Sequence, residues 1–530
     1  MQLQPSMDRK SDIETADAIN KRISEIEREC TQNSSSETSK RIPPEVLGYI
    51  FTLTIARDQD HSSLYSETYF EGLKRGSYGY LFVSHYWREV AFNTPELWSF
   101  WGNTVEDWDR LHHHAGAAPV DLVLDGYEDG QEELSAPLQE KLRDRITQDK
   151  IQRIHLRGED SNFLGSILFN LTPNGEGAQE KRIESFIFCT KTIPKELPNF
   201  FARSRLPFLR RLQISGALPI PLWDHLESQT TRLTVLSLQI TWTKFPLTTS
   251  QLVQILVANP NLQDLSLSGV LPDRVENVQL NRVPLGHLKT IDLGGNLGPI
   301  FQLLERLELP AALNLMNLNV EGPTSAEINS VLVPYLQDHF RRDVRFKEPL
   351  AVEVSFEHHF KITVCPDAWY REEEPVWPLT TISVVTGQLH PGREQLVIDL
   401  MEAIPQESVK FLQTNFISEL PGILFASMLN LNHLWLEDLT LSDGFIGPFP
   451  TAPGWILLPS LISLCLKNVT AKDGNWQPLV TYLERRFSDD KLTLLQVNTG
   501  SEMSPEVANQ IKRRVRSFKY NDPPDEPVHE

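Results

Sequence analysis

The sequence predicts an α/β fold in which a small three-helix module precedes an irregular α/β solenoid. Two observations predict it. Residues 41–101 hold a proline-led apolar helix and a tryptophan-rich helical segment. Beyond about residue 119, a pattern of apolar residues recurs at steps of 24 to 32 residues, with helical sequence between its copies. Such a unit cannot bury its own apolar face, so its copies must stack.

Length and charge bound the class of protein. The chain has 530 residues, of which 40% are hydrophobic, and this favours several domains or one long solenoid. Its 50 Lys and Arg residues face 70 Asp and Glu residues, for a formal net charge of −20. Nucleic acid and anionic membranes require a basic surface, so neither is expected as a partner.

The cysteines and the apolar runs indicate a compartment. The four cysteines lie far apart, at Cys30, Cys189, Cys365 and Cys465. They form no C-x-x-C pair and are expected to be reduced thiols. With no apolar signal region and no run of about 18 apolar residues, the chain is expected to be soluble, and cytoplasmic or nuclear. The basic run at 512–519 is either a nuclear-import patch or basic residues at a helix C-terminus.

Residues 1–40 are predicted to hold an amphipathic helix and a polar linker. Ser11 and Glu14 fit a capping box for a helix over 11–30. That helix either forms a short coiled coil that dimerises the protein, or it lies on the next domain or frays, and its short length favours the second interpretation. Residues 31–40 are the linker.

The helical module is predicted over residues 41–101. Pro43 and Pro44 fit a first helical turn, where a missing N–H costs no hydrogen bond. Glu45 places negative charge where the helix dipole favours it. An apolar stripe follows, formed by Val46, Leu47, Ile50 and Phe51. So short a stripe must be buried against this chain's own core or against a partner.

An irregular leucine-rich-repeat solenoid is predicted over residues 119–503. Its segments match the pattern L-x-x-[LI]-x-[LI] strictly or approximately, and this pattern is typical of repeats with a period of about 20–29 residues. The central apolar residues are Ile154, Phe186, Leu212, Leu236, Leu265, Ile291, Leu318, Leu434, Leu464 and Leu495. Residues 250–260 show the helical half of one unit, with Asn259–Pro260 as its stop.

The pattern weakens over 322–428, which is interpreted as degenerate repeats or, alternatively, as an inserted domain. Strands are expected at 351–364 and 380–385, with a further irregular strand at 394–400. Helices are expected at 325–340 and 406–416.

The end of the chain is predicted to close the solenoid. A helix is expected over 504–520, with Ser504 as its cap and Pro505 at its first position. Residues 521–530 are expected to be a disordered acidic tail.

The helical module resembles the F-box. That family shows L-P-x-E-[IVL], a following I-F, then V-C-x-x-W-R-x-[IVL]-A and P-x-L-W. This sequence offers I-P-P-E-V at 42–46, I-F at 50–51, V-S-H-Y-W-R-E-V-A at 83–91 and P-E-L-W at 95–98. It departs at Ile42, where leucine is usual, and at Ser84, where cysteine is usual. It looks most like the form abundant in mushroom-type (basidiomycete) fungi, which carries irregular leucine-rich repeats after the F-box.

The resemblance implies a function. An F-box protein docks a Skp-type adaptor, and through it a cullin and its RING subunit, while its repeats hold a target protein for ubiquitin transfer. The chain would then be no enzyme. The implied adaptor-binding or module-shaping residues are Pro43, Pro44, Glu45, Leu47, Ile50, Phe51, Val83, Trp87, Leu97 and Trp98. Of these, Trp87 and Leu97 are expected to point inward.

The alternative is a leucine-rich interaction scaffold in which the helical unit only caps the solenoid. Exposure discriminates between the two hypotheses. Solvent-accessible Leu47, Ile50 and Phe51 would favour the ligase subunit, and cover by the repeats would favour the cap.

Candidate target-binding residues lie on or just after predicted strands. Trp435 sits between Leu434 and Leu436, so it should point outward and contact a target, unless a neighbouring loop covers it. Asp438, Lys467 and Asn468 are weaker candidates of the same kind.

No cofactor, metal or catalytic residue is expected. His112–His114 and His358–His359 lack the ligand spacing of a closed zinc site. The glycines of 293–298 fit a repeat turn rather than a phosphate loop. No G-x-S-x-G or H-E-x-x-H motif occurs.

Overall fold

The computed structural model divides the chain into two compact units, Met1–His225 and Leu226–Glu530. The structure describes residues 42–59, 83–102, 113–126, 136–159, 161–172, 179–192, 194–216, 232–240, 247–272, 282–310, 313–347, 349–356, 360–366, 380–385, 393–415, 427–438, 440–441, 458, 460–485, 492–499 and 502–521. The predicted helix over 11–30, its linker, His112, His358–His359 and tail residues 522–530 lie outside these ranges.

The first unit begins with a helical module. Its elements are α2 (Pro44–Gln59), α4 (His85–Phe92) and the 3-10 turn η3 (Pro95–Trp98). The Ser84 hydroxyl caps α4 by accepting the Trp87 N–H at 3.1 Å. Proline leads both α2 and η3, where its missing N–H costs no intrahelical bond. The three elements pack on one another and lead directly into the first strand.

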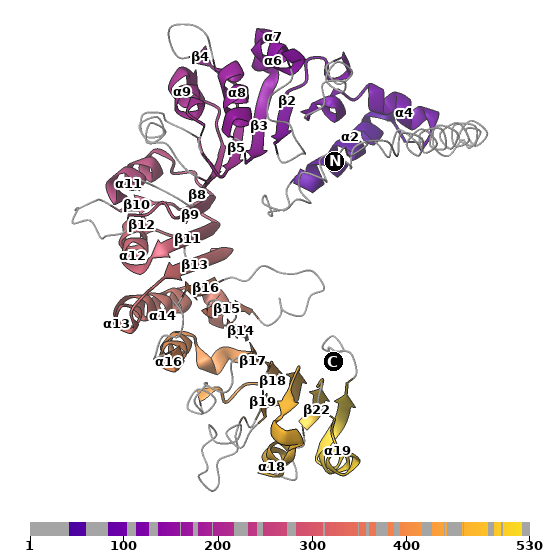
Figure 1. Ribbon diagram of the computed structural model, residues 1–530, viewed down its shortest axis with the longest axis vertical. Helices are drawn as coiled ribbons and strands as arrows, with labels where there is room; N and C mark the ends of the chain where they lie inside the picture. The colour runs from indigo at the N-terminus through magenta and orange to yellow at the C-terminus, as the bar shows by residue number, and fades with distance from the viewer. Residues whose placement is uncertain are drawn as a thin grey trace, which may run out of the picture. The chain divides into compact units, whose positions relative to one another are not determined.

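A parallel sheet follows in the first unit (Figure 1). Its strands are β1 (Phe100–Trp101), β2 (Val120–Asp125), β3 (Ile151–Gly158), β5 (Ser185–Thr190) and β7 (Arg211–Gly216), paired in chain order. The intervening helices are α6 (Ala136–Arg143), α7 (Arg145–Lys150), α8 (Ser161–Leu171) and α9 (Glu196–Arg203). A short parallel pair, β4 (Gln179–Glu180) with β6 (Ser204–Arg205), joins the turns beside them.

The second unit continues the strand–helix alternation. In paired order its strands are β8 (Val235–Ile240), β9 (Asp264–Ser268), β11 (Thr290–Asn296), β13 (Leu315–Glu321), β16 (Thr380–Val385), β15 (Phe360–Pro366), β14 (Leu350–Phe356), β17 (Val409–Thr414), β18 (His433–Glu437), β20 (Ser463–Lys467), β22 (Leu492–Val497) and β23 (Val515–Tyr520). Only β15 in this series is antiparallel to its neighbours. Two short parallel pairs accompany them, β10 (Val283–Pro284) with β12 (Leu307–Glu308) and β19 (Thr440–Leu441) with β21 (Thr470–Ala471).

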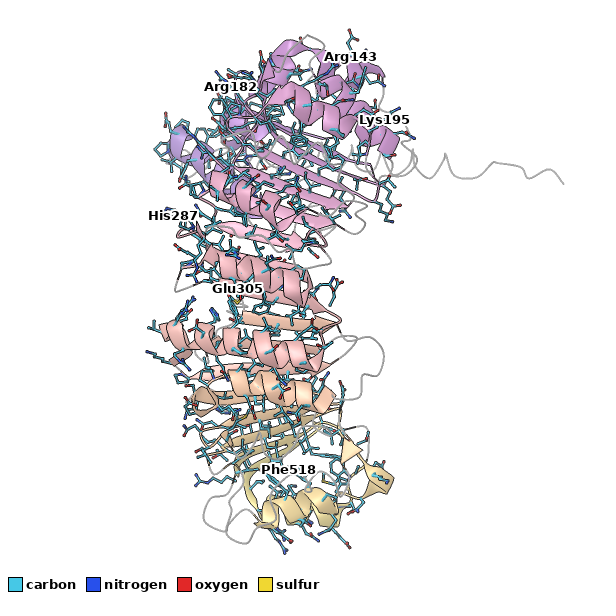
Figure 2. All side chains as sticks on the ribbon, turned by 90° about the vertical axis from the view of Figure 1, so that its left-hand side faces the viewer. Arg143, Arg182, Lys195, His287, Glu305 and Phe518 are labelled. Atoms are coloured by element: carbon cyan, nitrogen blue, oxygen red, sulfur yellow. The ribbon has the colours of Figure 1, made fainter. Side chains whose placement is uncertain are left out.

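Helices of the second unit lie on one face of this sheet (Figures 1 and 2). They are α11 (Thr249–Ala258), α12 (Leu297–Arg306), α13 (Ser325–Glu327) with the π turn η4 (Ile328–Leu332), α14 (Val333–Arg342), α16 (Arg393–Ala403), α18 (Gln477–Arg485) and α19 (Pro505–Lys512), with 3-10 turns η5 (Val344–Lys347), η6 (Gln406–Ser408) and η9 (Lys472–Gly474). The alternating leucines of the strands face these helices. Leu265 and Leu267 of β9, for example, are at most 1% exposed. The other face carries the intervening side chains and no described helix.

Helix α11 illustrates how one unit is held together. Thr248 and Gln251 form a reciprocal capping box at its start. Asn259 ends it, as the sequence predicts: its side-chain amide donates to the Ile255 carbonyl at 2.7 Å and accepts the Leu233 N–H at 3.2 Å. One buried asparagine thereby fixes the helix end to the chain entering β8.

The strand register confirms most of the predicted repeat phase. Ile154 pairs with Phe186, Phe186 with Leu212, Leu434 with Leu464 and Leu464 with Leu495. One marker is wrong: Ile291 pairs with Met316, not Leu318. The segment has apolar residues at 313, 315, 316, 318 and 320, so two phases compete, and the less typical methionine occupies the first core position.

The described strands within residues 322–428 belong to the same sheet. Strands β14, β15 and β16 lie where strands are predicted, and the antiparallel β15 breaks the repeat spacing. Two predictions there are wrong. Residues 394–400 belong to helix α16, whose Leu400 and Met401 are buried. Within the segment predicted as a helix over 406–416, residues 406–414 form η6 and strand β17, where Val409 and Leu412 fill the core.

The predicted closing helix is wrong beyond Lys512. Ser504 caps α19 by accepting the Val507 N–H at 3.3 Å, and Pro505 takes its first position as predicted. The chain then turns and forms β23, which pairs in parallel with β22. The β-favouring residues Val515, Phe518 and Tyr520 pair along this strand.

No described helix has the length and apolar content needed to cross a membrane.

Candidate functional sites

The helical module has a small core of its own. Leu47 and Phe51 of α2 are at most 2% exposed, and Phe51 meets the Trp87 ring edge-on at 5.3 Å. Trp98 is 1% exposed, and its indole N–H donates to the Ala91 carbonyl at 2.8 Å. These contacts join α2, α4 and η3 into one packed unit.

Aromatic contacts also join the module to the chain that enters the first repeat. The His114 ring lies 5.0 Å from Trp98 and 4.8 Å from Phe92. Beside it, Phe100 and Trp101 of β1 pair with Asp121 and Leu122 of β2. The module is therefore continuous with the first edge of the sheet in this unit.

An apolar stripe on α2 is left outside the module's core. Val46, Tyr49 and Ile50 are 48%, 63% and 40% exposed, and their spacing of three and four residues places them on one helix face. Val83, just before α4, is 53% exposed. We call the exposed residues Val46, Tyr49 and Ile50 the α2 stripe. Isolated exposed apolar residues need no explanation, but a stripe of three on one turn indicates a contact surface.

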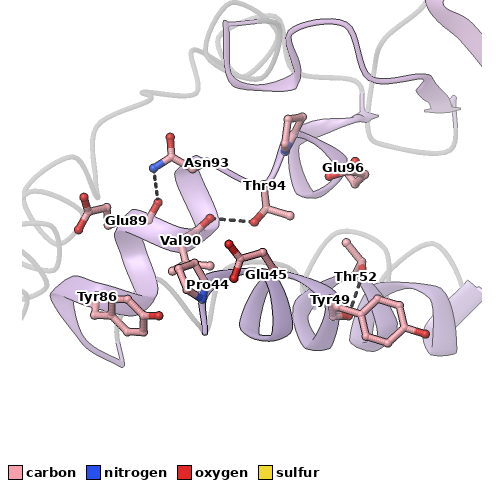
Figure 3. Close-up of a pocket in the computed structure, with 12 residues that line it drawn as sticks. Pro44, Glu45, Tyr49, Thr52, Tyr86, Glu89, Val90, Asn93, Thr94 and Glu96 are labelled. Atoms are coloured by element: carbon pink, nitrogen blue, oxygen red, sulfur yellow. Dashed lines mark hydrogen bonds between the residues drawn. The ribbon is translucent and has the colours of Figure 1, made fainter. Parts of the chain in front are cut away.

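A groove of about 690 Å³ lies beside the stripe, between α2 and the α4–η3 segment (Figure 3). Its lining includes Tyr49 and Tyr86 and three acidic residues, Glu45, Glu89 and Glu96. No Lys or Arg is among the described residues that line it. The groove thus combines aromatic surface with negative charge.

Gly48 lets the two sides of the groove approach. A Cβ at this position would lie 2.9 Å from Thr94 Oγ1. That hydroxyl is fixed because it donates to the Val90 carbonyl at 2.8 Å (Figure 3). Glycine is therefore required by close packing, not by an unusual backbone angle.

The structure divides the residues predicted to bind the adaptor. Exposed are Pro43, Pro44, Glu45, Ile50 and Val83; buried are Leu47, Phe51, Leu97 and Trp98, and Trp87 is half-buried. Leu97 points inward as expected. The exposure test between the two hypotheses gives a divided result, because Ile50 is exposed whereas Leu47 and Phe51 are buried in the module's own core. Sequence reasoning missed Tyr49, Tyr86 and the glycine contact. Tyr49 could have been found from its spacing of three residues from Val46, which places both on one helix face. Tyr86 and the Gly48 contact could not, because they depend on tertiary packing.

The second candidate surface is the helix-free face around Trp435. Leu434 and Leu436 are buried on the opposite side of β18, so Trp435 has the predicted orientation. It is half-buried and packs on the buried side chains of Ala351, Cys365 and Phe411. Neighbouring strands β14, β15 and β17 thus supply the packing against one side of the indole.

A charged pair borders this tryptophan. The Lys467 ammonium lies 5.9 Å from the Trp435 ring centroid and 3.0 Å from a Glu437 carboxylate oxygen. The indole Nε1 is enclosed and has no hydrogen-bond partner among the described residues. Burial raises the pKa of the adjacent Cys465 thiol to about 11, which favours its protonated form at neutral pH.

The other two predicted target-binding residues, Asp438 and Asn468, form the turns that follow strands β18 and β20. Asp438 and Asn468 occupy equivalent positions in consecutive repeats, with φ of 53° and 52°. The Asn468 amide donates to the Asp438 carboxylate at 3.1 Å, and the Asp438 N–H donates to the Lys467 carbonyl at 3.0 Å. Asparagine and aspartate tolerate this left-handed conformation better than most residues.

Polar ladders elsewhere on the helix-free faces were not predicted. In the second unit, Asp292 accepts hydrogen bonds from Ser266 at 2.9 Å and Asn317 at 2.8 Å. Burial raises its pKa, and the two hydrogen bonds oppose that rise. Ser266, Asp292 and Asn317 lie one per repeat at the same strand position. This pattern can be recognised only once the strand register is known.

A second buried polar cluster lies in the first unit. Burial raises the pKa of Asp121 to about 6, although the guanidinium of Arg153, 3.4 Å away, opposes the rise and Glu184 adds to it. Burial also lowers the pKa of His155 to about 3, with Arg153 and Arg211 acting in the same direction. Among the described residues, no three His, Cys, Asp or Glu side chains gather as a metal site would require.

No protein-family model matches the chain. No curated protein matches it. Among solved structures, a plant peptide hormone receptor, RGFR1 in complex with RGF2, is similar with a TM-score of 0.23 and 12% identity over 80% of this chain. The match spans 62% of the receptor chain. The repeat architecture therefore rests on the strand register of this molecule.

Proposed function

We propose that the chain is a substrate-recognition subunit of a Skp–cullin–F-box ubiquitin ligase. The helical module would dock a Skp-type adaptor, which links it to a cullin, and the helix-free face of the repeats would bind the target protein. The chain itself would perform no chemistry.

The observation that carries the proposal is the α2 stripe. The module closes its own core with Leu47, Phe51 and Trp98, and Val46, Tyr49 and Ile50 lie outside that core. Because these side chains are already about half-buried, covering the rest of each against a partner would contribute on the order of 1 kcal/mol. Clustered anchors of this kind dominate many interfaces.

A partner for the groove is expected to complement its chemistry. Glu45, Glu89 and Glu96 give the lining negative charge, so the docking segment should carry basic or hydrogen-bond-donating groups beside its apolar ones. This requirement distinguishes the surface from a purely apolar helix pair.

The experiment is co-expression of the full chain with a fungal Skp-type adaptor. We expect a stoichiometric complex, lost in Val46→Asp with Ile50→Asp. Because both side chains are exposed, the double variant should keep its fold. Val257→Asp is the matched control, since Val257 is 58% exposed on α11 in the other unit. A well-folded wild type that forms no complex would remove the ligase proposal.

The second candidate is a leucine-rich interaction scaffold with the module as its N-terminal cap. Pairing of β1 with β2 and the His114–Trp98 contact favour it, because they join the module to the sheet. Under this alternative Val46→Asp with Ile50→Asp changes no interaction, whereas Trp98→Ala lowers the stability of the first unit.

A further inference from the structure

The last strand of the second unit presents an open edge. β23 pairs with β22 from Leu492↔Val515 to Val497↔Tyr520, and no residue-by-residue pairing in the described part of the chain joins a strand to its other side. The Asn521 N–H donates to the Val497 carbonyl at 2.8 Å. Peptide groups alternate in direction along a strand, so those of Arg516 and Phe518 point away from β22. The N–H and C=O groups of these two residues therefore face the open edge, where an added strand could pair with them.

The side chains at this edge are strongly basic. Residues 512–520 contain Lys512, Arg513, Arg514, Arg516 and Lys519 and no acidic residue, in a chain of net charge −20. Arg514 is engaged by the Glu484 carboxylate. Lys512, Arg513 and Arg516 are exposed. The edge therefore combines outward backbone groups with local positive charge.

Charge and sequence decide which strand fits. A second copy of β23 would bring like charges together, which is unfavourable. The chain's own residues 522–530 are acidic, but Pro523, Pro524 and Pro527 lack the N–H that a strand needs. An acidic extended peptide from another protein meets neither obstacle.

We propose that the β23 edge binds an acidic, extended peptide of a partner protein by adding it to the sheet as a strand. Backbone hydrogen bonds to Arg516 and Phe518 supply the pairing, and Arg513 and Arg516 select acidic side chains. This site is separate from the adaptor-docking module and does not depend on the proposed ligase function.

The test uses the full chain and a short fluorescent peptide of alternating Glu and Val, followed by anisotropy. Two matched peptides serve as controls: one has Lys in place of Glu, and one is N-methylated at alternate residues to remove backbone donors. We expect the acidic peptide to bind, more weakly as salt rises. Neither control peptide should bind measurably.

Two substitutions at one position separate charge from backbone pairing. Arg516→Gln removes the charge only, whereas Arg516→Pro also removes an outward N–H without breaking a bond to β22. We expect Arg516→Pro to bind about fivefold more weakly than Arg516→Gln, as for the loss of one hydrogen bond. An unchanged thermal midpoint of Arg516→Pro shows that its last strand is intact. If the midpoint falls, the N-methylated peptide with the wild-type chain still tests whether backbone pairing is needed.

Three results would overturn the proposal. The first is no binding of the acidic peptide. The second is equal binding of the N-methylated peptide, since the attraction would then be electrostatic alone. The third is self-association of the chain that Arg516→Pro abolishes, because the edge would then belong to a second copy.

Discussion

Single side chains decide how the helical module can be used. Leu47 and Phe51 alternate with Val46 and Ile50 along α2, yet the first pair is buried in the module and the second is exposed. The sequence shows that all four are apolar, but not which face the module buries. That division depends on α4 and η3, which are distant in the sequence. Substitutions at neighbouring positions should therefore have opposite consequences.

Gly48→Ala is predicted to destabilise the module. Alanine normally stabilises a helix interior by about 0.5–1 kcal/mol relative to glycine. Here its Cβ would lie 2.9 Å from the fixed Thr94 hydroxyl, and overpacking costs about 1–3 kcal/mol. The urea midpoint of the first unit should fall. Gly286→Ala, with nothing within 4 Å, is the control; equal effects at both sites would contradict the close contact.

Two buried groups should give opposite pH dependences in the first unit. The folded-state pKa of Asp121, raised from 3.8 to about 6, means that the folded state holds the proton more tightly, so stability falls as pH rises across that window. The folded-state pKa of His155, lowered from 6.5 to about 3, means that stability falls as pH drops through its window.

We therefore expect Asp121→Asn to steepen the loss of stability below pH 6.5, and His155→Leu to flatten it. Urea midpoints measured between pH 4 and 7 check both. Parallel curves for the wild type and either variant would show that the group does not titrate differently on folding.

At the scale of elements, repeat strands could be predicted well because their leucines alternate at a regular period. Predictions failed where one segment carried two patterns. Residues 394–400 contain an apolar run that fits either a strand or a buried helix, and they form helix α16. Residues 515–520 continue a sequence that fits a helix, but they form strand β23 because the free side of β22 is available for pairing. In both cases a tertiary neighbour decides the outcome.

The end of α11 should depend on one asparagine. Asn259 is 1% exposed and serves both the last turn of the helix and the chain entering β8. Asn259→Ala leaves a buried N–H and a carbonyl without this partner, at about 1–3 kcal/mol. Thermal unfolding of the second unit measures it. Thr248→Ser, which keeps the capping hydroxyl, should change little; a comparable loss there would contradict the assignment.

At the scale of the whole molecule, the proposed docking surface and the proposed target-binding surface belong to different units. The α2 stripe belongs to the first unit and Trp435 to the second. The F-box resemblance could suggest the adaptor surface, because its motif is local in sequence. The Trp435 surface could be predicted only as an outward position, since the cluster around it draws on strands that lie up to 84 residues earlier (435 − 351).

Separate surfaces predict separable defects. Trp435→Ala should leave adaptor binding unchanged and weaken capture of the target, with a loss of about 2 kcal/mol or more if it is a hot spot. Co-purification with the adaptor and target abundance in cells measure the two effects. Loss of adaptor binding in this variant would show that the two surfaces are not independent.

The proposed docking of a Skp-type adaptor on the exposed face of α2 can be measured by calorimetric titration of the purified chain with purified adaptor. We expect one-to-one binding that is unchanged by Val257→Asp. Val46→Asp with Ile50→Asp should weaken it at least about a hundredfold, because two apolar anchors become charges buried in the interface. Binding with full affinity by the double variant, or no binding by the folded wild type, would contradict the proposed docking.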